Sequence, residues 1–402
     1  MPIADTSTSS VLRTTLLALA LSMGAAVSLG LARFAYGLLL PVMRTDLGWS
    51  YALAGAMNTA NAAGYLIGAL ATPLLMRRYE AAHVMMAGAF AACVFMGLSG
   101  CFVTVGPWFA LRVLAGVASA LAFIGGGLLA ARLGSMHPER CGFLIGLYYG
   151  GSGLGIVASA LAVPVALQFA AGTAHGWTWA WFVLAALCVL ATLLLAWPAR
   201  ELHGQHGAST AGAAPATHFR WQPFSFALGG YAMFGLGYIG YMTFVIALLR
   251  EQGVSAGGIS FFYALLGAAV VASSRLWSGL LDRHHNGTPM AVLNGLLGVA
   301  TLLPVVTVSW PAMLVSGALF GAVFLSVVAS TTALVRHNLP AAQWAAGIGA
   351  FTIVFAAGQI IGPVIVGWIS DGAGGLTRGL LISTLALWAG ALLASRQKKL
   401  SA

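Results

Sequence analysis

The chain has 402 residues, of which 60% are hydrophobic and only 6% are charged, and its formal net charge is +10. Soluble domains carry about 25% charged residues, so this composition excludes a single water-soluble core. Apolar runs long enough to cross a bilayer recur from one end of the chain to the other. We therefore expect an all-α membrane protein with twelve transmembrane helices in two pseudo-symmetric six-helix bundles.

The predicted elements divide the chain as follows. Residues 1–12 are polar and are predicted to be a disordered tail. The first bundle occupies residues 13–198, with spans at 15–42, 51–75, 82–104, 107–132, 141–168 and 177–198. Residues 199–220 form the longest hydrophilic stretch and have the composition of a linker. The second bundle occupies residues 221–395, with spans at 222–249, 257–281, 288–308, 311–335, 344–370 and 376–395, and residues 396–402 form a basic tail.

The basic residues are distributed unevenly between the two sides of the predicted membrane. Twelve of the 18 Lys and Arg residues fall on the side of the N-terminus, three fall on the opposite side, and three fall inside predicted helices. The positive-inside rule then places both termini in the cytoplasm, in a multi-pass protein of the inner membrane. The net charge reflects this topology and contact with anionic lipid headgroups, so it does not imply a nucleic-acid partner.

The two predicted bundles repeat each other in sequence. Residues 46–50 match residues 251–255, and Gly142 and Gly153 match Gly347 and Gly358, all at an offset of 205. Pro107 and Arg132 match Pro311 and Arg336 at an offset of 204. Such duplicated halves are typical of transporters that expose a site alternately to the two sides of a membrane.

Several short motifs resemble those of the major facilitator superfamily (MFS). They are Arg112-Val-Leu-Ala-Gly116, Gly279-Leu-Leu-Asp282-Arg283 and Pro138-Glu139-Arg140-Cys141-Gly142. Three further stretches resemble the YbfB/YjiJ-like bacterial branch, and these are Leu31-Ala-Arg33-Phe-Ala-Tyr36, Asn61-Ala-Ala-Gly64 and Ser274-Arg275-Leu-Trp277. The resemblance implies the MFS fold and secondary transport by alternating access.

Two departures from the superfamily pattern bear on this expectation. The first-half loop Met76-Arg77-Arg78-Tyr79-Glu80 lacks the aspartate of the loop signature. The two halves are therefore not expected to close the cytoplasmic side through equivalent loop contacts. The stretch 146–153 is rich in glycine but lacks the Gly-Pro pair typical of drug antiporters, which weakens an export function.

The ionisable residues within the predicted spans are arginines. All eight acidic residues and all nine histidines map to tails, loops or helix ends, whereas Arg33 and Arg112 lie inside spans. A guanidinium in hydrocarbon costs a few kcal/mol, so such a residue is expected to face a bundle interior or a wet cavity. Because arginine binds a carboxylate through two hydrogen bonds, an anionic cargo would suit it.

Each arginine also has a structural interpretation. Arg33 could be held by helix carbonyls and water rather than by cargo. Arg112 could fix its helix against the first helix or take part in proton coupling. Arg275 lies near a helix end, where its side chain can reach the headgroups, so it has a structural or gating role.

Several uncharged polar residues are predicted to bind substrate together with Arg33 and Arg112. The offset of 205 pairs Arg33 with Tyr238 and Tyr36 with Tyr241, and Tyr36 should share a helix face with Arg33. Hydrogen bonding between helices is the structural alternative for the asparagines. The remaining predicted substrate contacts are Asn58, Asn61, Tyr149 and Gln359.

Gating is assigned to Asp282, Arg283 and Arg275 at the cytoplasmic side. The adjacent His284 and His285 have no further ligands near them in sequence, so we expect a solvated loop there, no metal site and no cofactor.

We predict a secondary active transporter for a small organic anion, with carboxylates as the candidate chemical class. Coupling is to protons or by exchange of one anion for another. The main alternative is efflux of hydrophobic or drug-like compounds, and a sensor with this fold is a further one. The motifs of a membrane enzyme, such as His-Glu-x-x-His or Gly-x-Ser-x-Gly, are absent from the sequence. The expected partners are the substrate, the lipid bilayer and a coupling proton. The protein is expected to be a monomer.

Overall fold

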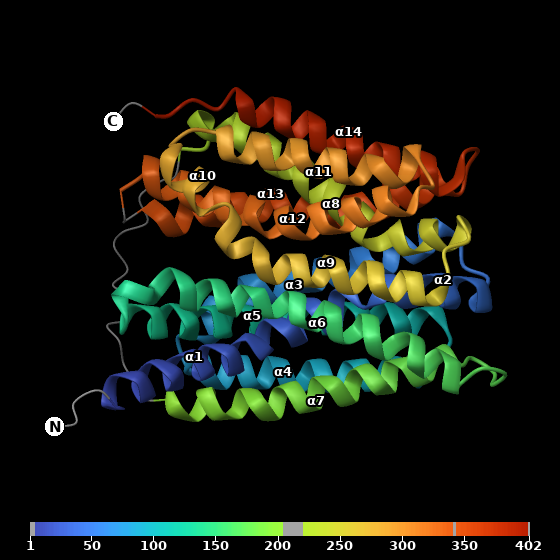
Figure 1. Cartoon of the computed structure of the whole chain (residues 1–402), viewed down its shortest axis with the longest axis horizontal. Helices are drawn as coiled ribbons and strands as arrows, with labels where there is room; N and C mark the ends of the chain where they lie inside the picture. Colours follow the sequence, from blue (N-terminus) through green and yellow to red (C-terminus); the bar gives the residue numbers. More distant parts are fainter. Residues whose placement is uncertain (1–4, 204–219, 341–342, 401–402) are drawn as a thin grey trace. The chain divides into compact units, whose positions relative to one another are not determined.

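The chain folds into helices that form two compact units. The computed structural model describes residues 5–203, 220–340 and 343–400 (Figure 1). One unit combines residues 1–35 with 64–208, and the other combines residues 36–63 with 209–402. Residues 36–63, which belong to the first half of the sequence repeat, are thus counted with the second unit.

The first unit is built from the following helices and from residues 64–75 of α3 (Tyr51–Leu75). They are α1 (Asp5–Ala25), the π-helix η1 (Ala26–Phe34), α4 (Ala81–Ser99), α5 (Val105–Ser135), the 3-10 turn η2 (Pro138–Arg140), α6 (Cys141–Phe169) and α7 (Trp177–Glu201). Three fully buried indoles, those of Trp108, Trp177 and Trp181, pack edge to face where α5 and α7 begin. Edge-to-face contacts of this kind stabilise beyond the area they bury.

The second unit contains the first part of α3 and nine further helical segments. They are α2 (Tyr36–Leu47), the 3-10 turn η3 (Gln222–Phe224), α8 (Ser225–Glu251), α9 (Ala256–Leu276), α10 (Ser278–Arg283), α11 (Thr288–Val306), α12 (Trp310–Asn338), α13 (Trp344–Ser370) and α14 (Gly375–Ser395). Most side chains of α8 are buried, because α11, α13 and α14 all pack against this helix.

The described helices agree with the predicted all-α membrane architecture. Eleven of them are long and apolar enough to cross a membrane. The 25-residue α3 lies outside that set, because Asn58, Thr59 and Asn61 lower its hydropathy. Counting α3, the described part of the chain is consistent with the twelve predicted spans.

Some element ends differ from the prediction. The single span predicted at 257–281 breaks at Trp277, where φ is −110° and ψ is 0°, and the chain continues as α10. The Trp277 indole donates a hydrogen bond to the carbonyl of Ala322 at 2.7 Å, which holds the break against α12. α1 begins at Asp5, inside the stretch assigned to a tail. Most of the predicted linker, residues 204–219, lies outside the described residues.

The C-terminal segment after α14 contains a buried glutamine, Gln397, that bonds to other parts of the second unit. The Gln397 side chain accepts a hydrogen bond from the Ala227 amide at 3.2 Å and donates one to the Pro223 carbonyl at 2.9 Å. The backbone carbonyl of Gln397 accepts a hydrogen bond from the Gly287 amide at 3.0 Å. The basic residues that follow are therefore anchored beside the starts of α8 and α11.

Candidate functional site

In the first unit, both predicted binding arginines are buried where η1 meets α5. Arg33 on η1 is 3% exposed and Arg112 on α5 is 1% exposed. Arg112 Nη1 donates a hydrogen bond to the Ala32 carbonyl at 3.1 Å, one residue before Arg33. The two guanidinium groups therefore sit on adjoining elements inside one unit.

Paired serines, Ser28 on η1 and Ser119 on α5, also hold these two elements together. Ser28 Oγ donates to the Ser119 carbonyl at 2.7 Å, and Ser119 Oγ donates to the Ser28 carbonyl at 3.1 Å. These reciprocal bonds satisfy two buried hydroxyls and fix the distance between the two backbones. The position of Arg112 against Ala32 is therefore determined by its scaffold as well as by its own bond.

Arg33 also faces an aromatic ring. Its Cζ atom lies 5.6 Å from the ring centroid of Tyr65, which is half-buried on the second part of α3. A guanidinium within about 6 Å of a ring centroid is attracted by the ring's negative face. Tyr65 thus supplies one part of the environment that Arg33 needs inside an apolar bundle.

The π-helix η1 packs closely against α6. Ala35 N donates to the Gly30 carbonyl at 3.1 Å, five residues back, which is the π-helical pattern. A Cβ added to Gly30 would lie 2.5 Å from the Gly155 Cα of α6, so the two backbones touch. Short π-helical segments are frequent at functional sites. This one carries Arg33.

In the second unit, Tyr36, Asn58 and Thr243 are buried polar residues of α2, α3 and α8. Tyr36 OH donates to the Ala54 carbonyl at 2.8 Å. Asn58 Nδ2 donates to Thr243 Oγ1 on α8 at 2.6 Å. The Asn58 Oδ1 atom has no hydrogen-bond partner among the described residues. Asn61, one turn further along α3, is fully buried.

The two tyrosines of α8 have different partners. Tyr238 OH donates to Gln359 Oε1 on α13 at 2.9 Å. Tyr241 OH and Ser316 Oγ on α12 are 2.6 Å apart, and Ser316 Oγ also donates to the Ala300 carbonyl. The structure therefore joins Tyr238 with Gln359, as two predicted binding residues, and turns Tyr241 toward a different neighbour.

Around Tyr238, five rings from α8, α12 and α13 lie nearly parallel. Neighbouring ring centroids are 4.8–6.0 Å apart, with interplanar angles of 9°–19°. We call this group the aromatic stack, and it consists of Tyr231, Phe234, Tyr238, Phe324 and Phe355. Offset parallel stacking is a favoured geometry for such rings. Four of the five rings are buried and Phe355 is half-buried.

The remaining predicted site residues have other neighbours or are exposed. Tyr149 on α6 is 40% exposed and contacts the rings of Phe123 and Tyr148. Its neighbour Tyr148 is fully buried, and Tyr148 OH donates to the Phe123 carbonyl at 2.6 Å. The residues assigned to gating are exposed at the end of α9 and in α10, and they are Arg275, Asp282 and Arg283.

A third polar group of the second unit escaped the sequence analysis. Asp371, at the end of α13, accepts hydrogen bonds from the backbone amides of Tyr51 at 2.7 Å and Ala52 at 2.9 Å, at the start of α3. Tyr51 OH donates to Glu251, and the Arg44 guanidinium lies 3.6 Å from the Tyr51 ring centroid. A carboxylate near a helix N-terminus is stabilised by the helix dipole. Only the position of these acids at helix ends was visible in the sequence.

Comparison with known proteins identifies a family. The family model described as "Uncharacterised MFS-type transporter YbfB" matches residues 25–395. No curated protein matches the chain.

Solved structures of low sequence identity share the fold. A crystal structure titled as a bacterial homolog of the human lysosomal transporter Spinster, in an inward-facing and occupied conformation, has a TM-score of 0.71 at 16% identity, with 97% of each chain covered. The nucleoside transporter NupG has a TM-score of 0.71 at 12% identity, with 96% of this chain and 97% of that chain covered. At these identities, the similarity establishes the MFS fold.

Proposed function

Because the chain belongs to the YbfB family of MFS transporters, we propose that it moves a small organic anion across the inner membrane by alternating access. A carboxylate is the preferred class of cargo. The observation that carries this proposal is the pair of buried guanidinium groups, those of Arg33 and Arg112, on adjoining elements of the first unit.

The charge balance within the spans supports an anion. The eight acidic residues lie in the first or last turns of helices, in caps or in short segments between spans. The interior of the spans therefore has a positive electrostatic potential around Arg33 and Arg112. A carboxylate bound there would gain charge-assisted hydrogen bonds, which are about twice as strong as neutral ones. A cationic cargo would be repelled.

The same distribution limits the coupling mechanism. Proton-coupled transporters commonly carry a titratable acid or histidine within the spans, whereas here these residues occupy helix ends. In our proposal, the proton crosses on the substrate itself, or one anion is exchanged for another. Uptake into proteoliposomes under a pH gradient, or with anion loaded on the inside, separates these two modes.

The decisive experiment compares Arg33→Gln with Arg378→Gln in purified protein. Arg378 is exposed near the start of α14, so its variant is the matched control for the loss of one positive charge. We expect a panel of mono- and dicarboxylates to raise the melting temperature of the parent and of R378Q. In R33Q, the affinity for the stabilising carboxylate should fall at least tenfold, which corresponds to about 1.4 kcal/mol.

Transport of the same carboxylate should follow this pattern in proteoliposomes. Arg33→Lys keeps the charge but loses the planar fork, so it should restore binding only in part. Unchanged affinity in R33Q would overturn the anion proposal.

The aromatic stack of the second unit favours a second candidate, efflux of hydrophobic or drug-like compounds. Stacked rings offer an apolar surface that suits planar neutral molecules. In this case Arg33 and Arg112 have structural roles, and stabilisation by neutral aromatic compounds alone would select this function. Phe355→Ala should then weaken the response to neutral compounds, because Phe355 is the half-buried member of the stack.

A further inference from the structure

We propose that Glu80, His83 and His203 form a binding site for one divalent transition-metal ion, with Zn²⁺ as the probe of choice. The three side chains belong to the first unit and are far from Arg33 in the chain. Their metal-ligating atoms all lie within 4.8 Å of one another. The site is independent of the cargo, and the sequence analysis did not foresee it.

Local structure explains why two of the ligands point the same way. Glu80 is the N-cap residue of α4, with extended backbone at φ −67° and ψ 152°. His83 follows three residues later, within the first helical turn. Residues three apart at a helix start lie on one side of the helix, so the carboxylate and the imidazole share a face.

The third ligand is delivered by the end of α7, which packs against α4. Leu202 caps α7, and its side chain is 3% exposed. Its amide donates to the Pro198 carbonyl at 2.9 Å. Because Leu202 is anchored in the core, the backbone of the next residue, His203, is held beside the start of α4.

The distances approach those of a coordination sphere. His203 Nε2 and Glu80 Oε2 are 3.5 Å apart. The His83 and His203 ring centroids are 5.1 Å apart, with an interplanar angle of 87°. Metal bonds of about 2.1 Å in a tetrahedron place ligand atoms roughly 3.4 Å apart. Closing the remaining gaps requires rotamer changes of the exposed His83 and His203 and of the half-buried Glu80.

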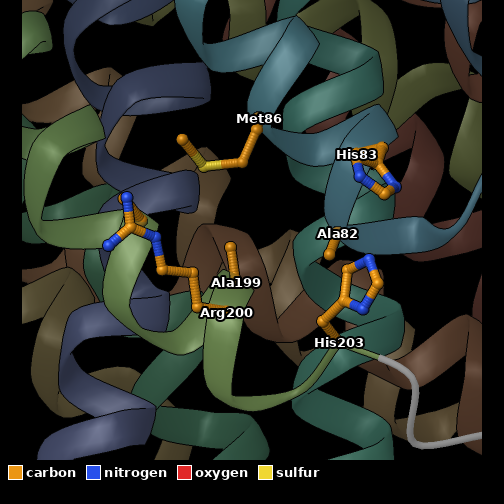
Figure 2. A pocket seen from close by; sticks show the side chains of 7 residues that line it. Ala82, His83, Met86, Ala199, Arg200 and His203 are labelled. Atoms are coloured by element: carbon orange, nitrogen blue, oxygen red, sulfur yellow. The ribbon is translucent and has the colours of Figure 1, made fainter.

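The cluster lies beside a pocket of about 430 Å³. Figure 2 shows the two imidazoles facing each other on one side of this pocket, with Ala82 and Ala199 between the helices. Arg200 lines the other side, and its guanidinium points away from the imidazoles. The positive charge of Arg200 is thus directed away from the proposed ion site.

The donor set selects the class of ion. Two imidazoles and one carboxylate match the three protein ligands of open Zn²⁺ sites, where water occupies the remaining position. Neutral imidazole nitrogens favour zinc, copper and nickel, whereas Mg²⁺ and Ca²⁺ prefer oxygen ligands. One bound ion would tie the start of α4 to the end of α7.

The test uses the full-length protein in detergent, purified with an affinity tag that contains no histidine and stripped of metal with chelator. Titration calorimetry with Zn²⁺ measures affinity and stoichiometry. The visible spectrum of added Co²⁺ reports whether the ion has the low coordination number of the proposed site. The variants are His83→Ala, His203→Ala and Glu80→Gln. His284→Ala/His285→Ala is the control, because it removes two adjacent histidines elsewhere on the chain.

The parent should bind one Zn²⁺ per chain, and its melting temperature should rise with the ion. Each of H83A and H203A should lower the affinity at least tenfold and remove the cobalt absorption bands, and E80Q should weaken binding. The H284A/H285A control should bind as the parent does. The proposal is overturned if the parent binds no Zn²⁺, if H83A and H203A keep the parent affinity, or if the control alone loses it. All of these readouts are independent of transport, so they leave the anion proposal untouched.

Discussion

At the residue scale, the bond from Asn58 to Thr243 links a helix of the first sequence half to α8 inside the second unit. The donor and acceptor are 2.6 Å apart and both residues are buried. Buried hydrogen bonds contribute about 1 kcal/mol each, and those between membrane helices average about 0.6 kcal/mol. The pair is therefore a measurable tie between α3 and α8.

A double-mutant cycle tests this tie. Asn58→Ala and Thr243→Val should each lower the thermal stability of purified protein. Their combined effect should fall short of the sum by about 0.5–1 kcal/mol, because the second change finds the bond already lost. Thr45→Val is the control, since its hydroxyl donates only locally, to the Pro41 carbonyl. Strict additivity of N58A and T243V would show that the bond adds no stability.

The polar residues of the candidate site could be selected from the sequence, but their hydrogen-bond partners could not. Arg33, Arg112, Asn58 and Asn61 stand out because polar groups inside apolar runs require a reason, and all four are buried. Their acceptors, such as the Ala32 carbonyl and Thr243, are invisible in sequence because they depend on how helices pack. The repeat relates Tyr241 to Tyr36 as an equivalent position, but it does not reveal that Tyr241 bonds with Ser316.

At the element scale, close contact between glycines joins η1 to α6. A Cβ on Gly155 would lie 2.5 Å from the Ala26 carbonyl oxygen and 2.8 Å from the Gly30 Cα. The second unit contains an analogous contact, where a Cβ on Gly358 of α13 would lie 2.4 Å from the Ala232 carbonyl oxygen of α8. Helices in membranes approach this closely only where small residues line the interface.

Gly155→Ala should therefore destabilise the protein, because backbone atoms of η1 cannot move aside as a flexible side chain would. We expect a loss of about 1–3 kcal/mol, the usual range for overpacking. Gly142→Ala is the matched control on the same helix, since its Cβ would meet nothing within 4 Å. That change should raise stability slightly, because alanine favours helix by up to about 1 kcal/mol. Thermal unfolding in detergent distinguishes the two, and equal effects would contradict the packing argument.

Helix positions were predictable from hydropathy, whereas helix irregularities were not. The break at Trp277 lies at a contact with α12, and the π-helix η1 lies at a contact with α6. A hydropathy pattern records only which residues are apolar. It contains no information on a backbone that adapts to a neighbouring helix.

At the scale of the whole molecule, the twelve-to-three distribution of basic residues predicts a fixed orientation. A fluorescent protein fused after residue 402 should mature and fluoresce in bacterial cells, and alkaline phosphatase fused at the same place should be inactive. Fusions within the segment between α2 and α3, at Gly48, should give the opposite pattern. Active phosphatase at the C-terminus would invert the proposed topology and the side assigned to every helix end.

The π-helix η1 has a consequence for chain length. Its wider turns hold more residues than α-helical turns of equal rotation, so η1 accommodates residues that would be surplus in an α-helix of the same rotation. If the stretch 26–34 were shortened by one residue, it could adopt α-helical hydrogen bonding. The hydrogen bond from Tyr36 to the Ala54 carbonyl should then be kept. The same deletion within α2 would swing every later side chain of that helix by about 100°.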